Sequence, residues 1–128
     1  MDNALACPKP LHDRAQALVE VANQLLALSS QLVGAGRHAE AVAPAQAAVD
    51  VLRDFEPLPE AQAAYLALFA GALHALAVRL IDAQRPEDAL QPAVEALEAY
   101  RRLAEDDPNA FQSQLAALEQ LVASLSQS

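Results

Sequence analysis

The chain has 128 residues and a formal net charge of −9, from 17 acidic and 8 basic side chains. That length fits one domain, and the charge argues against a nucleic-acid-binding protein, because phosphates require a basic patch and none is visible. Hydrophobic residues make up 54% of the chain, aromatic residues only 4%, and there are 3 glycines. Alanine and leucine supply most of the apolar surface, which is typical of closely packed helices and excludes a turn-rich β fold.

Targeting and redox signals are sparse. Cys7 is the only cysteine, so neither an internal disulfide nor a cysteine-based metal site can form. The first residues lack the basic start and long apolar run of a secretory signal. Arg79 and Asp82 interrupt the best candidate for a transmembrane segment, at about residues 66–81. We therefore predict a cytoplasmic protein that binds neither a membrane nor a nucleic acid and that needs no metal or other cofactor.

Helical spacing of apolar residues predicts five helices in chain order. A flexible arm at residues 1–10 precedes them, and Gly36 and three proline-containing breaks separate them. At the last break, Asp107 is predicted as the N-cap and Pro108 as the first helical residue. The predicted helices cover about 11–35, 39–55, 60–83, 86–105 and 108–126.

Two stretches of the chain, residues 25–45 and 73–93, read as copies of one another. The offset is a constant 48 residues without a gap, as the pairs Arg37 and Arg85 show. A helical repeat of this length predicts stacked helix pairs and a protein that works through its surface. The predicted architecture is all-α: one repeat domain over 11–128, with units at about 11–55 and 60–105 and a final helix at about 108–126.

Pro44 and Pro92 occupy equivalent positions inside two predicted helices. An interior proline removes a backbone hydrogen bond and can cost about 3 kcal/mol. We expect either a shared bend or a helix that begins late. A ligand contact at the freed carbonyls of Glu40 and Asp88 is the alternative.

The shared string is Leu-x-x-Leu-small-x-x-Leu-x-x-Ala-x-Arg-x-x-acid-Ala-aliphatic-x-Pro-Ala, and it resembles the tetratricopeptide repeat family. In that family a small residue of the first helix packs against an alanine of the second. Ser29 with Ala41, and Ala77 with Ala89, fill these roles here. The period exceeds the family's usual ~34 residues and is similar to elongated variants from bacterial regulatory proteins.

The resemblance implies a curved scaffold in which the first helices of the pairs line a concave groove. Members that bind the C-terminal carboxylate of chaperones use a Lys/Asn/Arg clamp in this groove. The clamp positions here are Leu26, Ser30 and Ala75, so we exclude that partner class. The residues that the resemblance places in the partner-binding groove are Asn23, Leu26, Ser30, Val33, His74, Val78, Ile81 and Glu119.

Catalytic patterns are absent from the sequence. His12, His38 and His74 have no zinc-site spacing. The acidic pairs at 87–88 and 106–107 fall at predicted helix starts, where the helix dipole favours negative charge. His38 reads as a solvated turn residue, and His74 as either a groove residue or a partly buried spacer. We predict that the protein is not an enzyme.

Three functional hypotheses remain open at this point. The leading one is a protein-interaction scaffold that holds a peptide, a helix or a partner protein in its groove. The second is a homodimeric structural or regulatory domain, because two and a half repeats bury little by themselves. The third is a small-ligand sensor with a site between helices, which a pocket containing several of His74, Arg79, Asp82 and Glu119 would favour.

Overall fold

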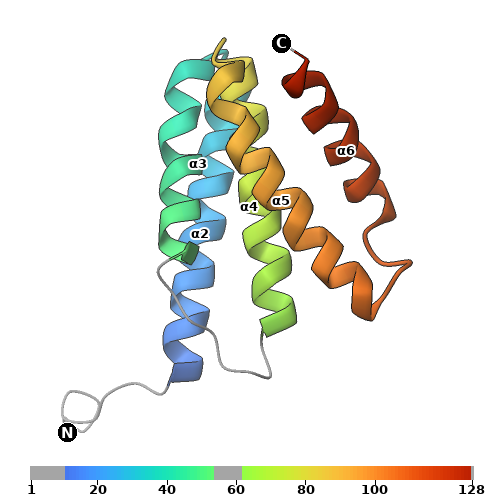
Figure 1. Cartoon of the computed structure of the whole chain (residues 1–128). Coiled ribbons are helices and arrows are strands. Elements are labelled where there is room, and N and C mark those ends of the chain that lie inside the picture. Colours follow the sequence, from blue (N-terminus) through green and yellow to red (C-terminus); the bar gives the residue numbers. More distant parts are fainter. Residues whose placement is uncertain (1–10, 54–61, 128) are drawn as a thin grey trace, which may run out of the picture.

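A computed structural model describes residues 11–53 and 62–127, with side chains from Ala17 onward (Figure 1). The described residues form helices and no strands, which confirms the all-α prediction. The predicted arm at residues 1–10 lies outside this range. The helices are α2 (Leu11–Gly34), α3 (His38–Arg53), α4 (Gln62–Asp82), α5 (Pro86–Asp106) and α6 (Gln112–Ser126).

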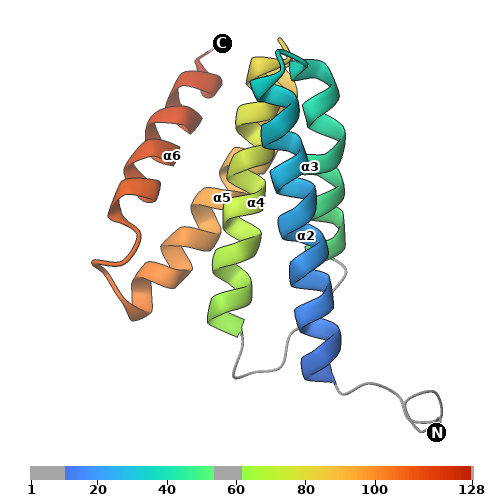
Figure 2. The ribbon, with the colours of Figure 1, turned by 180° about the vertical axis from the view of Figure 1, so that it is seen from behind.

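Each helix packs on the next one in the chain: α2 on α3, α3 on α4, α4 on α5 and α5 on α6. Successive helices run in alternate directions, and α3 and α5 form the near side in Figure 1. Seen from behind in Figure 2, α2 and α4 form the near side and α6 stands beside α5. These contacts are those of a helical bundle, in which each helix buries one face against a neighbour.

Alanines build the contacts of the second helix in each repeat. Fully buried alanines recur 48 residues apart in α3 and α5: Ala41, Ala45 and Ala48 match Ala89, Ala93 and Ala96. Side chains this small let the helix axes approach closely, and large residues such as Leu52 and Leu73 fill the remaining space. The sequence repeat is therefore also a repeat of burial.

The turns between paired helices are also equivalent. Gly36 and Gln84, 48 residues apart, both have left-handed backbones, with φ of 79° and 67°. In each turn the following arginine N–H donates to the carbonyl of a leucine five residues earlier, at 2.8 Å. This bond and its neighbours form the Schellman motif that closes a helix C-terminus. Gly36 adopts that conformation freely, whereas Gln84 adopts it at a steric cost.

Both interior prolines lie well inside their helices. α3 begins at His38 and α5 at Pro86, six residues before Pro44 and Pro92 respectively. The expectation of a helix that begins late is therefore wrong. Both proline rings are buried, so apolar packing offsets part of the lost hydrogen bond.

The start of the last helix differs from the prediction. Residues 107–111 form a turn, in which the Ala110 N–H donates to the Asp107 carbonyl at 3.1 Å. The helix begins at Gln112 with Phe111 as N-cap, so Asp107 and Pro108 do not start it. Phe111 packs its ring on Tyr100 of α5, with 5.3 Å between ring centroids. This tertiary contact, rather than the local capping signal, sets the entry to α6.

Among the described residues, α4 is the one helix long and apolar enough to cross a membrane by length and composition. Arg79 and Asp82 fall in its last turn, so they interrupt its apolar stretch less than predicted. In the structure α4 packs between α3 and α5. About one third of its apolar window is buried there. A core helix of a bundle passes the same test of length and composition, so the test does not separate the two roles.

Candidate functional site

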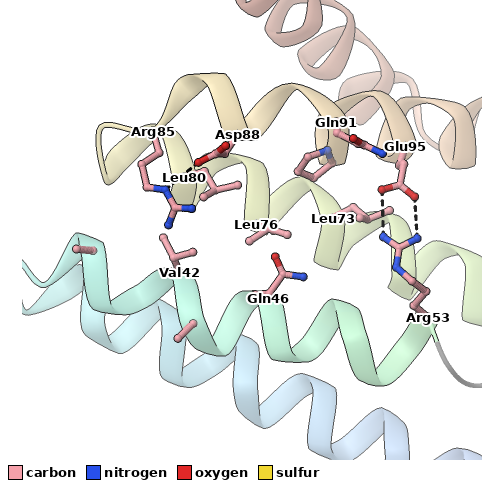
Figure 3. A pocket seen from close by; sticks show the side chains of 13 residues that line it. Val42, Gln46, Arg53, Leu73, Leu76, Leu80, Arg85, Asp88, Gln91 and Glu95 are labelled. Carbon is pink, nitrogen blue, oxygen red and sulfur yellow. Dashed lines mark hydrogen bonds and ion pairs between the residues drawn. The ribbon is translucent and has the colours of Figure 1, made fainter.

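A groove lies between α3 and α5, with α4 as its floor (Figure 3). Its volume is about 610 Å³, within the range of ligand and peptide sites. The floor consists of Leu73, Leu76 and Leu80, which the 3.6-residue period places on one face of α4. The groove therefore has a nearly buried leucine floor and largely polar walls, between two helices of equivalent position in the sequence repeat.

An ion pair crosses one end of the groove. Arg53, the last residue of α3, donates from Nη1 and Nη2 to the two carboxylate oxygens of Glu95 on α5, at 3.0 and 3.1 Å. The guanidinium also lies 5.4 Å from the centre of the Phe69 ring of α4. The hydrogen bonds with Glu95 raise the pKa of the Arg53 guanidinium, which therefore stays charged. This bridge links α3 to α5 at that end of the groove.

A second ion pair lies at the other end of the groove, between two residues at the start of α5. Arg85 Nε donates to Asp88 Oδ2 at 3.0 Å, across the first turn of α5. Between the two ion pairs, the amides of Gln46 on α3 and Gln91 on α5 line the walls. The charges inside the groove thus balance one another and leave amides for further hydrogen bonds.

The side of α5 next to the groove has a second hollow of about 480 Å³, which shares Gln91 and Glu95 with the lining of the groove. Leu90 and Val94 form its apolar part, and the carboxylates of Glu87 and Glu98 stand at its two ends. Neither carboxylate has an ion-pair partner among the described residues. The exposed ridge of α5 is therefore acidic and lies directly beside the groove.

The predicted groove lies on other helices, α2, α4 and α6. The structure brings α2 and α4 together where Arg79 Nη2 donates to Ser30 Oγ at 3.3 Å. Glu119 of α6 instead forms an ion pair with Arg101 of α5, at 3.7 Å. Of the eight predicted groove residues, Asn23, Ser30 and Glu119 are exposed, and Leu26, Val33, His74, Val78 and Ile81 are half-buried.

Ser29 is the centre of a buried polar junction between three helices. Its Oγ donates to the Ala41 carbonyl of α3 at 2.7 Å and accepts from Arg79 Nε of α4 at 3.1 Å. The predicted packing of Ser29 on Ala41 is thus confirmed, with an added hydrogen bond. Arg79 was not among the predicted groove residues and was named only for the ligand-sensor alternative, although it is the lone cation of the apolar α4.

The polar residues that would favour a ligand sensor are spread apart. Arg79 and Asp82 are 3.9 Å apart at their closest charged atoms, but neither they nor His74 or Glu119 line the groove. Burial lowers the pKa of the His74 imidazole, so it is neutral at pH 7. In the part of the chain that the structure describes, no three His, Cys, Asp or Glu side chains could hold a metal ion together.

His38 differs from its predicted role as a solvated turn residue. It is the first residue of α3 and is half-buried. Its Nδ1 atom is buried and has no hydrogen-bond partner among the described residues.

Comparison of the chain with protein-family models, with curated proteins and with solved structures finds no match in any of the three.

Proposed function

We propose that this chain is a non-enzymatic protein-interaction module, built as two stacked helix pairs and a closing helix. It binds an amphipathic, cationic peptide or helix in the groove between α3 and α5. The observation that carries this proposal is the leucine-floored groove beside unpaired carboxylates on α5.

The repeated burial and turn geometry support the stacked arrangement. The alanines of α3 and α5 are buried at equivalent positions, and the turns at Gly36 and Gln84 share one hydrogen-bond pattern. Two units that fold alike and pack in sequence are the elements of a helical repeat array. The tetratricopeptide-like string fits the same arrangement.

The groove defines the chemistry of its occupant. Leucine or similar side chains of a partner would cover Ala39 and Ala43, the exposed apolar residues of the lining, above the nearly buried Leu76. Burial of such side chains is the main source of binding free energy. Lysine or arginine side chains on the flanks would meet Glu87 and Glu98. A net charge of −9 would also speed the approach of a cationic partner at low salt.

A synthetic helical peptide with one leucine face and one lysine face provides a direct probe. We expect fluorescence anisotropy to show saturable binding that weakens with salt. Ala43→Arg, at an exposed position on the α3 wall, fills the groove and should weaken binding by about tenfold or more. Ala117→Arg on the exposed face of α6 adds the same charge elsewhere and should not weaken binding.

The variant Glu87→Lys/Glu98→Lys tests the acidic flank. We expect it to weaken binding of the lysine peptide and to reduce its salt dependence, because two attractive contacts become repulsive. A peptide with glutamate in place of lysine should show the opposite response. Equal binding of both peptides to the unaltered chain would contradict the proposal.

The same probe separates the groove from the predicted face on α2 and α4. Leu26→Arg and Val78→Arg place a cation on that face, away from the groove. If these variants lose the peptide while Ala43→Arg keeps it, the site is the one that the family resemblance implies. Circular dichroism checks that each variant keeps its helices.

A further inference from the structure

The outer side of α2 carries an uncovered apolar stripe. Val21 and Leu28 are 43% and 46% exposed, and they are the exposed large hydrophobic residues of the described chain. Half-buried Leu18, Leu25 and Leu32 lie between and beside them. The five residues are spaced 3, 4, 3 and 4 apart, which is the a and d pattern of a coiled-coil seam. We call these five residues the α2 stripe.

The internal repeat shows what such a stripe does when a neighbour is present. The same spacing recurs on α4. The α4 residues equivalent to Leu25, Leu28 and Leu32 are Leu73, Leu76 and Leu80, which are only 1%, 3% and 4% exposed. They lie opposite Val42 and Gln46 of α3, the second helix of the preceding pair (Figure 3). The α2 stripe has the same spacing on a helix that, in the described part of the chain, packs mainly on α3. A packed helix is therefore the occupant that its pattern suits.

We propose that a second copy of this chain covers the α2 stripe, with the two α2 helices packed against each other around a two-fold axis. Charge supports a second copy over a charged partner protein. Between Leu18 and Leu32 the one ionisable side chain is Glu20, which lies off the stripe, although the chain carries a net charge of −9. The positions beside the stripe are Gln24 and Gln31, so two acidic copies can meet there without repulsion.

The surface of α6, at the other end of the helix order, favours a two-fold dimer over a head-to-tail oligomer. Head-to-tail stacking would place the α2 stripe on the outer face of α6. That face is polar and small-residue-rich, with exposed residues at Gln112, Ser113, Ala116, Glu119 and Gln120. An apolar stripe therefore finds its match only on another α2 stripe, and a contact of identical surfaces closes as a two-fold dimer.

The size of the stripe sets the expected affinity. Its five residues span about 20 Å at 1.5 Å per residue, which is a short seam. Because α2 is already held as a helix by α3, dimer formation does not require helix nucleation. We expect a monomer–dimer equilibrium with a Kd in the micromolar range rather than a permanent dimer.

Sedimentation velocity over a wide range of concentrations tests the proposal. The unaltered chain should shift from monomer to dimer, and Leu28→Glu should weaken the dimer by about a hundredfold, since it buries a charge in the seam. Ala27→Glu, at the neighbouring exposed position off the stripe, should leave the dimer unchanged. Val21→Glu provides a second stripe variant if Leu28→Glu loses helicity.

Three results would overturn the proposal. The unaltered chain could stay monomeric at high micromolar concentration, the dimer could persist in both stripe variants, or the species could grow beyond a dimer with concentration. The third result would indicate head-to-tail stacking. Peptide binding in the groove is measured separately, so the failure of one proposal leaves the other intact.

Discussion

At the scale of single residues, the junction at Ser29 shows how one hydroxyl joins two repeats. Ser29 donates to α3 and accepts from Arg79 of α4, whereas its equivalent in the second repeat is Ala77, which has no hydroxyl. Hydrogen bonds between buried groups each contribute about 1 kcal/mol, and an orphaned partner costs more. The first repeat therefore uses a polar contact where the second relies on apolar packing alone.

Ser29→Ala should lower the free energy of unfolding by about 1–2 kcal/mol, because both hydrogen bonds are lost and Arg79 keeps only its outer contacts. Urea denaturation followed by circular dichroism measures the change. Ser30→Ala is the matched control, since Ser30 is exposed and should cost little. Equal stability of the two variants would show that the junction contributes nothing.

Gln84 has a left-handed backbone that is sterically unfavourable for a residue with a side chain, and the equivalent position of the first repeat is Gly36. Gln84→Gly should raise the free energy of unfolding by about 0.5–1 kcal/mol, because glycine adopts a positive φ without a steric cost but gains some entropy in the unfolded chain. Gly36→Gln is the converse variant and should destabilise the protein. Thermal unfolding of both variants measures the effect, and a less stable Gln84→Gly would contradict the assigned turn.

His74 gives the protein a predicted pH dependence. Burial lowers the pKa of His74 in the folded state below its unfolded value, so the unfolded chain takes up a proton first as pH falls. Stability is therefore lost as pH drops through about 6.5, the unfolded pKa. His74→Leu, which copies Leu26 of the first repeat, should reduce the loss of stability between about pH 7.5 and about pH 5.5. Urea midpoints at the two pH values measure it, and an unchanged difference would contradict the assignment.

At the scale of helices, equivalent residues have different surroundings. Leu28 and Leu76 are 48 residues apart, yet Leu28 is largely exposed and Leu76 is buried. Leu76→Ala should cost about 2–5 kcal/mol through lost burial and the cavity that remains. Leu28→Ala, measured at low concentration where the chain is monomeric, should cost less than about 1 kcal/mol. Similar costs in urea denaturation would mean that α2 has a covering neighbour within the same chain.

Helix boundaries show how far local signals reach. The period of apolar residues places the first four helices within about two residues at their described ends, because those ends follow from the glycine and proline signals. The start of α6 was not predictable in this way. Asp107 and Pro108 form a good local cap, but the contact of Phe111 with Tyr100 moves the helix start to Gln112. A contact between distant residues is invisible to a local pattern.

At the scale of the whole molecule, the sequence predicts the residues that form the floor of the groove, but not the helices that form its walls. Leu73, Leu76 and Leu80 share one face of α4 by their spacing alone. The Arg53–Glu95 bridge that spans the groove joins α3 to α5 across 42 residues of the chain, and such a long-range pair is not visible in a local pattern. The family resemblance instead predicted a groove on the first helices of the pairs, because that is where the resemblance places the partner-binding groove.

The central claim is that a cationic amphipathic segment binds between α3 and α5. Titration of the ¹⁵N-labelled chain with the leucine–lysine peptide tests it most directly, because amide chemical shifts report the contacted helices. The account predicts that the largest shifts occur at Ala43 and Gln46 of α3 and at Gln91 of α5. Shifts centred on Ser30 and Val78, with α3 and α5 unchanged, would contradict it.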